Sequence, residues 1–231
     1  MTYAIVEVFK TLQGEGMYAG HSAVFVRFAG CNLWSGRDED RHRDSVRNKA
    51  HCPLWCDTDF LKRATMDHQQ LMEAITSHGA DLVVFTGGEP MLQLTRELVV
   101  ACNKEGLRTC VETNGTVEAN RGVLGALNHV CVSPKHDIED LKLVMQMGRE
   151  GWFSFGGWSS ELKVVVPAYD PLKYDRLREL FTRCYVSPQA DTLMRGTSLI
   201  VKDNEQRAAE FCLSYPGWAL SLQTHKHLEL P

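Results

Sequence analysis

The sequence has 231 residues, which is enough for one domain with a single hydrophobic core. Hydrophobic residues make up 44% and charged residues 23%, values typical of a globular protein and not of a disordered chain. The formal net charge of −4 disfavours a broad nucleic-acid groove, which needs a strongly basic face, so we expect no nucleic-acid partner. The apolar runs are too short to span a bilayer and the N-terminus has no cleavage pattern. We therefore expect a cytoplasmic protein with no membrane partner and with reduced cysteines.

Strand-like and helix-like segments alternate along the chain. Strands are predicted at 3–9, 23–30, 82–85, 107–112, 129–133, 162–166, 185–187 and 218–223. Helices are predicted after Asp67, where Gln70 completes a capping box, at 94–105, after Asp170-Pro171 and at 204–215. This order predicts an α/β fold with a mostly parallel sheet, helices packed outside it and a ligand site at the carboxyl ends of the strands.

Two stretches, 35–51 and 136–160, interrupt this alternation. The first is polar and heavily charged, and the second ends in glycine and aromatic residues. We interpret both as insertions in a single domain that spans 1–231, and the first as a solvated loop.

Polar, turn-rich clusters follow five of the predicted strands. They are Thr86-Gly87-Gly88-Glu89-Pro90, Glu112-Thr113-Asn114-Gly115, Ser133-Pro134-Lys135, Ser187-Pro188-Gln189 and Thr224-His225-Lys226. One such cluster would be only a turn, but five at the edge where parallel sheets bind ligands indicate a ligand site. In the first cluster, adjacent glycines let a ligand approach the backbone closely, and the glutamate can hold a ligand ammonium.

Three cysteines form a separate candidate metal site. Twenty residues separate Cys31 from Cys52, and three separate Cys52 from Cys56. Three thiolates can hold a 4Fe–4S cluster and leave one iron open to a ligand. With His51 as a fourth ligand, the same cysteines could hold a structural zinc ion, and the spacing alone leaves both possibilities open. The other five cysteines lie in predicted strands or helices, where we interpret them as core residues.

These residues carry a resemblance to a known family. The three cysteines, the aromatic Trp55 before the last of them and the TGGEP turn resemble motifs of the radical S-adenosylmethionine (SAM) superfamily. Within it, the chain resembles the 7-carboxy-7-deazaguanine synthase family through motifs that span nearly its whole length. They are TLQGEG (11–16), VRFAGCNLW (26–34), CDTDF (56–60), TGGEPMLQ (86–93), ETNGT (112–116), VSPK (132–135), ELKVVVP (161–167) and QTHKHLELP (223–231). The resemblance implies a partial (β/α) barrel of the radical SAM type.

The resemblance also implies an activity. Enzymes of this family are carbon–nitrogen lyases that convert 6-carboxy-5,6,7,8-tetrahydropterin to 7-carboxy-7-deazaguanine in the pathway to queuosine and related deazapurines. The implied steps are hydrogen abstraction from the pterin by a SAM-derived radical, ring contraction and loss of ammonia. The implied cofactors are a 4Fe–4S cluster, SAM and Mg²⁺. The implied partners are the small-molecule pterin, a reducing protein such as flavodoxin, and a second copy of the chain in a homodimer.

Site residues follow from the resemblance, motif by motif. Cys31, Cys52 and Cys56 would hold the cluster, and Thr58 the magnesium ion. The residues that would bind SAM or lie beside it are Trp55, Asp57, Gly88, Glu89, Ser133, Pro134, Lys135, Ser187, Pro188, Gln189 and Ala190. Those that would bind the pterin are Leu12, Gln13, Gly14, Glu15, Arg27, Thr86 and, through a terminal carboxylate, Pro231. A guanidinium such as that of Arg27 suits a carboxylate because it can pair with both oxygens.

The chain departs from the usual pattern in three places. The usual gaps between the cysteines are three residues and then two, and some members of the family lengthen the first, whereas here the gaps are twenty and three, with Pro53 in the second. The segment around 141–160 is longer than we expect from relatives. SPQA (187–190) stands where relatives commonly have a Gln-Pro pair, which affects the expected adenine contacts. Two alternatives are a glycyl-radical-enzyme activase, which shares the cluster and the GGE turn but not TLQGEG, and a binding module stabilised by a Cys3His zinc site.

Overall fold

The computed structural model describes residues 1–49, 56, 60–61, 63–152, 159–194, 197–199 and 201–231. Within them, nine strands form one sheet in the order β11-β8-β7-β6-β5-β4-β2-β1-β3. These strands are β1 (Thr2–Leu12), β2 (Ser22–Phe28), β3 (Ala64–Asp67), β4 (Leu82–Gly87), β5 (Arg108–Thr113), β6 (His129–Val132), β7 (Ser159–Val166), β8 (Arg183–Pro188) and β11 (Ala219–Leu220). A separate hairpin consists of β9 (Asp191–Met194) and β10 (Thr197–Leu199).

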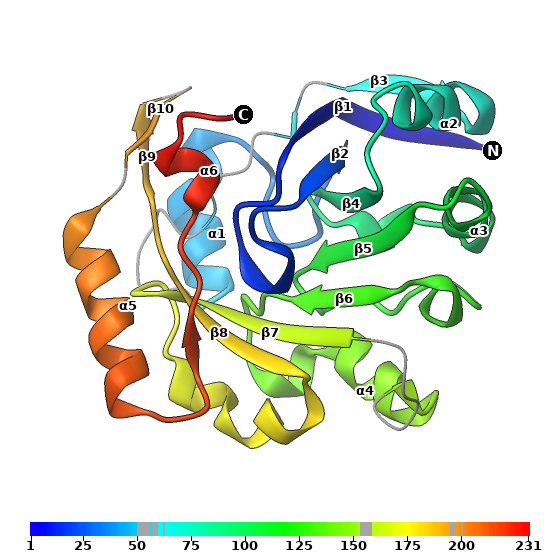
Figure 1. The fold of residues 1–231 in the computed structure, drawn as a ribbon. Helices are drawn as coiled ribbons and strands as arrows, with labels where there is room; N and C mark the ends of the chain where they lie inside the picture. Colours follow the sequence, from blue (N-terminus) through cyan, green and yellow to red (C-terminus); the bar gives the residue numbers. More distant parts are fainter. Residues whose placement is uncertain (50–55, 57–59, 62, 153–158, 195–196, 200) are drawn as a thin grey trace.

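The sheet is mostly parallel, as predicted. The neighbours from β2 through β8 to β11 pair in parallel, and β1 pairs antiparallel with both β2 and β3. The arrows of β4, β5 and β6 accordingly point the same way in Figure 1. The sheet is open, with β3 and β11 at its edges, and all the parallel strands deliver their carboxyl ends to one side.

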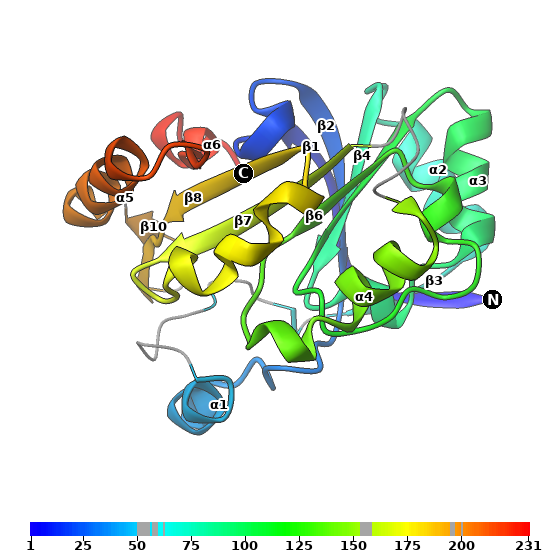
Figure 2. The ribbon, with the colours of Figure 1, turned by 90° about the horizontal axis from the view of Figure 1, so that it is seen from below.

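Helices cover the outside of the sheet. The α-helices are α1 (Arg41–Arg47), α2 (His68–Thr76), α3 (Arg96–Lys104), α4 (Lys142–Arg149), α5 (Lys202–Ser214) and α6 (Thr224–His227). The 3₁₀ segments are η1 (Gly16–Tyr18), η2 (Asp38–Asp40), η3 (Pro90–Leu92), η4 (Leu124–Ala126), η5 (Ile138–Asp140) and η7 (Pro171–Leu180). α2 and α3 contact each other. α2 packs against β1, α3 against β5, and α5 against β8 (Figures 1 and 2). Among the described residues, no helix is long and apolar enough to cross a membrane.

The two faces of the sheet differ in what they contact. Along β2, Val24, Val26 and Phe28 join the main hydrophobic core, which also contains the buried faces of α2 and α3. Ala23 and Phe25 point the other way, into a smaller apolar cluster. This alternation follows from the two-residue period of a strand. We call the second face, opposite the helices, the inner face.

Four local expectations need correction. The stretch 35–51 is not only a solvated loop, because it contains η2 and α1, and Asp44 and Asn48 are buried there. The stretch 136–160 contains η5 and α4. Asp170 does cap a helix, accepting from the Leu172 N–H at 2.9 Å, but that helix is 3₁₀. The last strand is only Ala219–Leu220, far shorter than the predicted 218–223.

Candidate functional site

The loop between β1 and β2, residues 13–21, folds onto the inner face. It is closed at its base by two backbone bonds, Gln13 N to His21 O at 2.8 Å and Gly20 N to Gln13 O at 2.7 Å. Gly16 has a φ of +64°, and a Cβ there would collide with the carboxylate of Glu161 on β7. Only glycine therefore allows the loop to approach the sheet this closely.

A row of polar side chains crosses the inner face under this loop. Arg27 on β2 pairs in register with Thr86 on β4. The next residues of the row are Glu112, Cys131 and Glu161, which are register partners across β5, β6 and β7. The row lies near the carboxyl ends of β2, β4 and β5, and it crosses β7 in the amino half of that strand. Its part on β2, β4 and β5 is therefore where parallel sheets bind ligands.

Arg27 is oriented by its neighbours on β1. Its Nε donates to Glu7 Oε1 at 2.7 Å, and its guanidinium lies 5.7 Å from the centroid of the Phe9 ring. The Arg27 side chain is 23% exposed, so it remains accessible to a ligand. A guanidinium held at the rim of the inner face in this way suits a carboxylate.

Lys163 introduces a buried positive charge on the inner face of β7. Its ammonium contacts the Glu15 carboxylate and lies 3.9 Å from Glu112 Oε1. Gln13 Nε2 also donates to Glu112 Oε1, at 3.0 Å. The pterin-binding residues predicted in the loop are therefore tied directly to β5 and β7.

Glu161 fixes the other side of the loop. Its Oε2 accepts from the Met17 N–H at 2.8 Å and lies 3.6 Å from His129 Nε2. His129 Nδ1 is 2.7 Å from Ser159 Oγ, and its ring packs edge-on against Tyr18. Burial raises the pKa of the Glu161 carboxyl, but hydrogen bonding and charge from His129 outweigh it, so the net pKa is lowered. An ionised Glu161 is therefore favoured as the acceptor for the loop backbone.

The Gly-Gly-Glu turn after β4 lies directly against the segment that carries Cys31. Gly88 N donates to Phe28 O at 3.0 Å, and Glu89 N donates to Gly30 O at 2.9 Å. A Cβ on Gly88 would collide with the Gly30 carbonyl oxygen. The structure thus brings together the predicted SAM turn and the first predicted cluster cysteine, with glycine required by the close approach of the two backbones.

A hydrogen-bonded chain of side chains extends this junction to the end of β5. Asn32, next to Cys31, donates through Nδ2 to Thr116 Oγ1 at 2.8 Å and accepts from Asn114 Nδ2 at 3.1 Å. Thr116 Oγ1 donates in turn to Asn114 Oδ1 at 2.7 Å. The turn after β5 and the segment after β2 are therefore held together beside Cys31.

Cys31 and Cys56 offer sulfur donors that fit an iron–sulfur cluster. Both are partly buried, and Leu33 N lies 3.4 Å from Cys31 Sγ. Burial raises the pKa of the Cys31 thiol to about 11, and Cys56 raises it further. Soft thiolates that receive backbone N–H bonds are typical cluster ligands. Among the described residues no three His, Cys, Asp or Glu side chains form a metal-binding group, and Cys52 lies outside those residues.

The remaining predicted SAM residues follow β6 and β8. Ser133 N donates to Thr113 O at 2.8 Å, Pro134 follows it, and the Lys135 ammonium lies 5.9 Å from the Tyr169 ring centroid. Ser187, Pro188 and Ala190 are buried, and Gln189 N donates to Val166 O at 2.8 Å. Trp55, Asp57 and Thr58 lie outside the described residues. The ligand roles of all these residues stay predictions.

The C-terminal segment meets the loop from the other side. Thr224 donates to Gly14 O through both N and Oγ1, each at 3.0 Å, and Gly16 N donates to Ser221 Oγ at 2.8 Å. Figure 1 shows this red segment beside the blue loop. Pro231 is exposed beyond α6. Its contact with a substrate stays a prediction.

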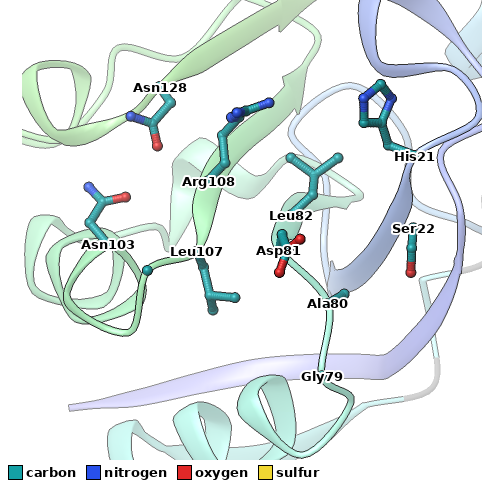
Figure 3. A pocket seen from close by; sticks show the side chains of 11 residues that line it. His21, Ser22, Gly79, Ala80, Asp81, Leu82, Asn103, Leu107, Arg108 and Asn128 are labelled. Atoms are coloured by element: carbon teal, nitrogen blue, oxygen red, sulfur yellow. The ribbon is translucent and has the colours of Figure 1, made fainter.

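A cleft of about 750 Å³ lies at the opposite end of the sheet (Figure 3). Leu82 and Arg108, at the amino ends of β4 and β5, line it, together with His21 and Asn128. The Asn128 Oδ1 atom accepts from Thr109 N at 2.8 Å, so this amide supports the start of β5. Because ligands of parallel sheets bind at the carboxyl ends, we place the candidate site on the other side.

Sequence reasoning did not assign roles to Glu161 and Lys163, or to Ser221. The signal for the first two was present: charged residues break the apolar run of β7, at positions that share one face. A charged residue on the buried face of a strand requires a partner, and so indicates a polar site beneath it.

No protein-family model matches the chain. The chain is 43% identical to a 7-carboxy-7-deazaguanine synthase of Caulobacter vibrioides over an alignment of 243 residues that covers 100% of both proteins. It is 40% identical to one of Burkholderia multivorans over 242 residues, again with 100% of both covered. It is also similar to the crystal structure of QueE from Escherichia coli, with a TM-score of 0.62 and 26% identity, covering 96% of this chain and 94% of that one.

Proposed function

The chain belongs to the 7-carboxy-7-deazaguanine synthase family, and we propose that it converts 6-carboxy-5,6,7,8-tetrahydropterin to 7-carboxy-7-deazaguanine with loss of ammonia. It is a radical SAM lyase of queuosine biosynthesis. One observation supports placing this function at the candidate site. The turn of Gly88 and Glu89 contacts the segment that carries Cys31, beside the polar inner face. The full-length relatives do not favour a glycyl-radical activase or a zinc module.

Cys31, Cys52 and Cys56 are the proposed ligands of a 4Fe–4S cluster, with SAM on the turn of Gly88 and Glu89. When bound, the cluster and SAM supply the one-electron chemistry that forms the radical. The chain itself supplies orientation and keeps water away from the reacting atoms. The position of Cys31 directly against the turn of Gly88 and Glu89 supports this proposal.

The pterin is proposed to lie beside the β1–β2 loop, over the ends of β2 and β4 that carry Arg27 and Thr86. The backbone of Leu12, Gln13 and Gly14 would receive its ring edge, and Arg27 its carboxylate. Thr86 adjoins Arg27 in register and would contribute a hydroxyl. Orientation of this kind can contribute much of the rate, because a fixed geometry replaces a search for the reactive pose.

Three further elements of the function are proposals from the family. Thr58 would give one oxygen to Mg²⁺, and the substrate carboxylate another, since magnesium prefers oxygen ligands. A reducing protein such as flavodoxin would deliver the electron. The chain would act as a cytoplasmic homodimer without nucleic acid or membrane.

Anaerobic reconstitution with iron and sulfide tests the proposed function. We expect a brown protein that, once reduced and given SAM and 6-carboxy-5,6,7,8-tetrahydropterin, forms a deazapurine detected by mass spectrometry. The Ala variants of Cys31, Cys52 and Cys56 should each lose the cluster absorbance and the product. Cys212→Ala is the matched control, because Cys212 is also partly buried but lies on α5.

Each other outcome identifies an alternative. A colourless protein with stoichiometric zinc contradicts the radical assignment and supports the zinc module. A brown protein that cleaves SAM but leaves the carboxypterin unchanged supports a different radical SAM activity.

A further inference from the structure

Lys163 is a charged residue deep inside the fold. It lies on the inner face of β7, and its side chain is 6% exposed. A buried ammonium is tolerated only where carboxylates pair with it. The Glu15 carboxylate, in contact with its Nζ atom, comes from the β1–β2 loop, and Glu112 at 3.9 Å comes from the end of β5.

Gln13 closes these contacts into a ring. Its Nε2 donates to Glu112 Oε1 at 3.0 Å, and its Oε1 accepts from Glu15 N at 3.1 Å. The ring therefore runs from Lys163 through Glu15 and Gln13 to Glu112, and back to Lys163. An amide with one donor and one acceptor engaged in this way has a fixed orientation.

The charges of the ring stabilise one another. Burial lowers the pKa of Lys163, but the carboxylates of Glu112 and Glu15 outweigh it and hold the pKa well above its usual value. Burial raises the pKa of Glu15, but Lys163 outweighs it and the net pKa is lowered. Lys163 therefore remains an ammonium and Glu15 a carboxylate at neutral pH.

We propose that Lys163 is a positioning residue for the pterin: by holding Glu15 and Glu112, it fixes Gln13 and Gly14 in the arrangement that receives the substrate. This inference rests on the proposed function. Lys163 does not touch the substrate, and it acts through the loop. Without the ammonium, two carboxylates repel each other across the site, and the loop moves away from β5.

Lys163→Met tests this positioning role. Glu15→Gln and the variant that carries both substitutions complete a double-mutant cycle. In the reconstituted holoenzyme, we expect Lys163→Met to raise the KM for the carboxypterin at least about tenfold, while the KM for SAM changes less than about twofold. Binding of 6-carboxypterin, followed by its fluorescence, should weaken by a similar factor. The double variant should lose no more than the worse single variant, because its members act through one interaction.

Lys10→Met is the matched control. Lys10 is an exposed lysine on β1 whose Nζ donates to His78 O and Gly79 O, away from the inner face. This variant should leave both KM values unchanged.

Several results would overturn the role of Lys163. They are an unchanged pterin KM in a folded Lys163→Met protein, equal changes in both KM values, or additive effects in the double variant. If Lys163→Met does not fold, the double variant decides, because it removes both charges of the contact pair. Failure of both to fold would assign Lys163 to the fold as a whole. If the wild type makes no deazapurine, the proposed function fails, while 6-carboxypterin binding still reports on Lys163.

Discussion

Glu89 shows at the scale of one residue how the turn after β4 is built. Its side chain has no exposure to solvent. Oε1 accepts from Thr113 Oγ1 at 2.7 Å and from Met91 N at 2.9 Å, and Oε2 accepts from Asn114 N at 2.8 Å. Burial nevertheless raises the pKa of this carboxyl to about 7, because these three donors do not fully replace water. A ligand ammonium beside Glu89 would favour its ionised form.

The raised pKa of Glu89 predicts a pH dependence of stability. In the unfolded chain the carboxyl titrates near its ordinary pKa of 4.5, so the folded state binds the proton more tightly. The stability that Glu89 contributes is therefore complete below about pH 4.5 and is lost as the pH rises through about 7. Glu89→Gln cannot ionise and lacks this loss. We expect the free energy of unfolding of the wild type, relative to Glu89→Gln, to fall by up to about 3 kcal/mol across this range.

Urea unfolding in the absence of SAM, at several pH values, measures this difference. The Gln variant also loses an acceptor beside Asn114 N, but that loss is independent of pH. A difference that stays flat between about pH 4.5 and pH 8 would show that Glu89 has an ordinary pKa in the folded protein.

At the scale of elements, α2 begins at the capping box that the sequence predicts. Gln70 N donates to Asp67 Oδ1, and Asp67 N donates to Gln70 Oε1, both at 2.9 Å. We expect Asp67→Ala to lower the free energy of unfolding by about 1 kcal/mol, because it leaves an N-terminal N–H without its acceptor. Asp67→Asn keeps the acceptor and should change it by only a few tenths of a kcal/mol.

Thermal unfolding of both variants measures the effect of the cap. The pterin KM should not change in either, because α2 lies outside the sheet. Equal losses for Asp67→Ala and Asp67→Asn would show that the side chain does not stabilise the helix as a cap.

Most strands of the sheet were predictable because short apolar runs between turn residues are typical of a buried parallel sheet, whereas β3, β9 and β10 were not predicted. The run at 82–85, for example, falls within β4. α4 also carries a readable pattern, since Leu143, Val144 and Met147 recur at helical spacing and are buried. Its interpretation as part of an insertion hid that pattern.

α1 could not be found in this way. Its buried residues are polar, and both Asp44 and the C-cap residue Asn48 bond to the segment after β2: Ser35 N donates to Asp44 Oδ2 at 3.0 Å, and Asn48 Nδ2 donates to Leu33 O at 2.8 Å. Such partners depend on the fold and leave no periodic signal in the sequence.

The candidate site was likewise predictable only in part. Its position at the strand ends was predictable, because the polar clusters follow the strands directly. The pairing of Lys163 with Glu15 was not, because it depends on how the β1–β2 loop crosses the inner face. Chemistry at a strand end can be read from sequence, whereas contacts between a loop and a distant strand require the structure.

At the scale of the whole molecule, the C-terminal segment meets the β1–β2 loop. The contacts of Thr224 with Gly14 and of Ser221 with Gly16 join residues more than 200 positions apart in the sequence. The loop is therefore held from β7 on one side and from the C-terminal segment on the other (Figure 1). Each hydrogen bond contributes about 1 kcal/mol to stability, so the two side-chain bonds together make opening of this loop about 2 kcal/mol harder.

The double variant Ser221→Ala/Thr224→Val removes both side-chain contacts and leaves the Thr224 N–H bond in place. We expect local opening of residues 13–21 to become easier by about 2 kcal/mol, which corresponds to a roughly thirtyfold faster amide hydrogen exchange in that loop. The pterin KM should rise with it, while the KM for SAM should not. Ser214→Ala is the control, because the Ser214 hydroxyl bonds to Glu210 O within α5.

The pattern of amide exchange distinguishes local opening of the loop from destabilisation of the whole domain. If amides of β4 and β5 accelerate as much as those of the loop, the C-terminal contacts stabilise the whole domain and do not hold the loop specifically. If the loop alone accelerates but the pterin KM is unchanged, the substrate itself orders the loop. Faster exchange confined to residues 13–21, together with a raised pterin KM, would show that the C-terminal segment completes the substrate site.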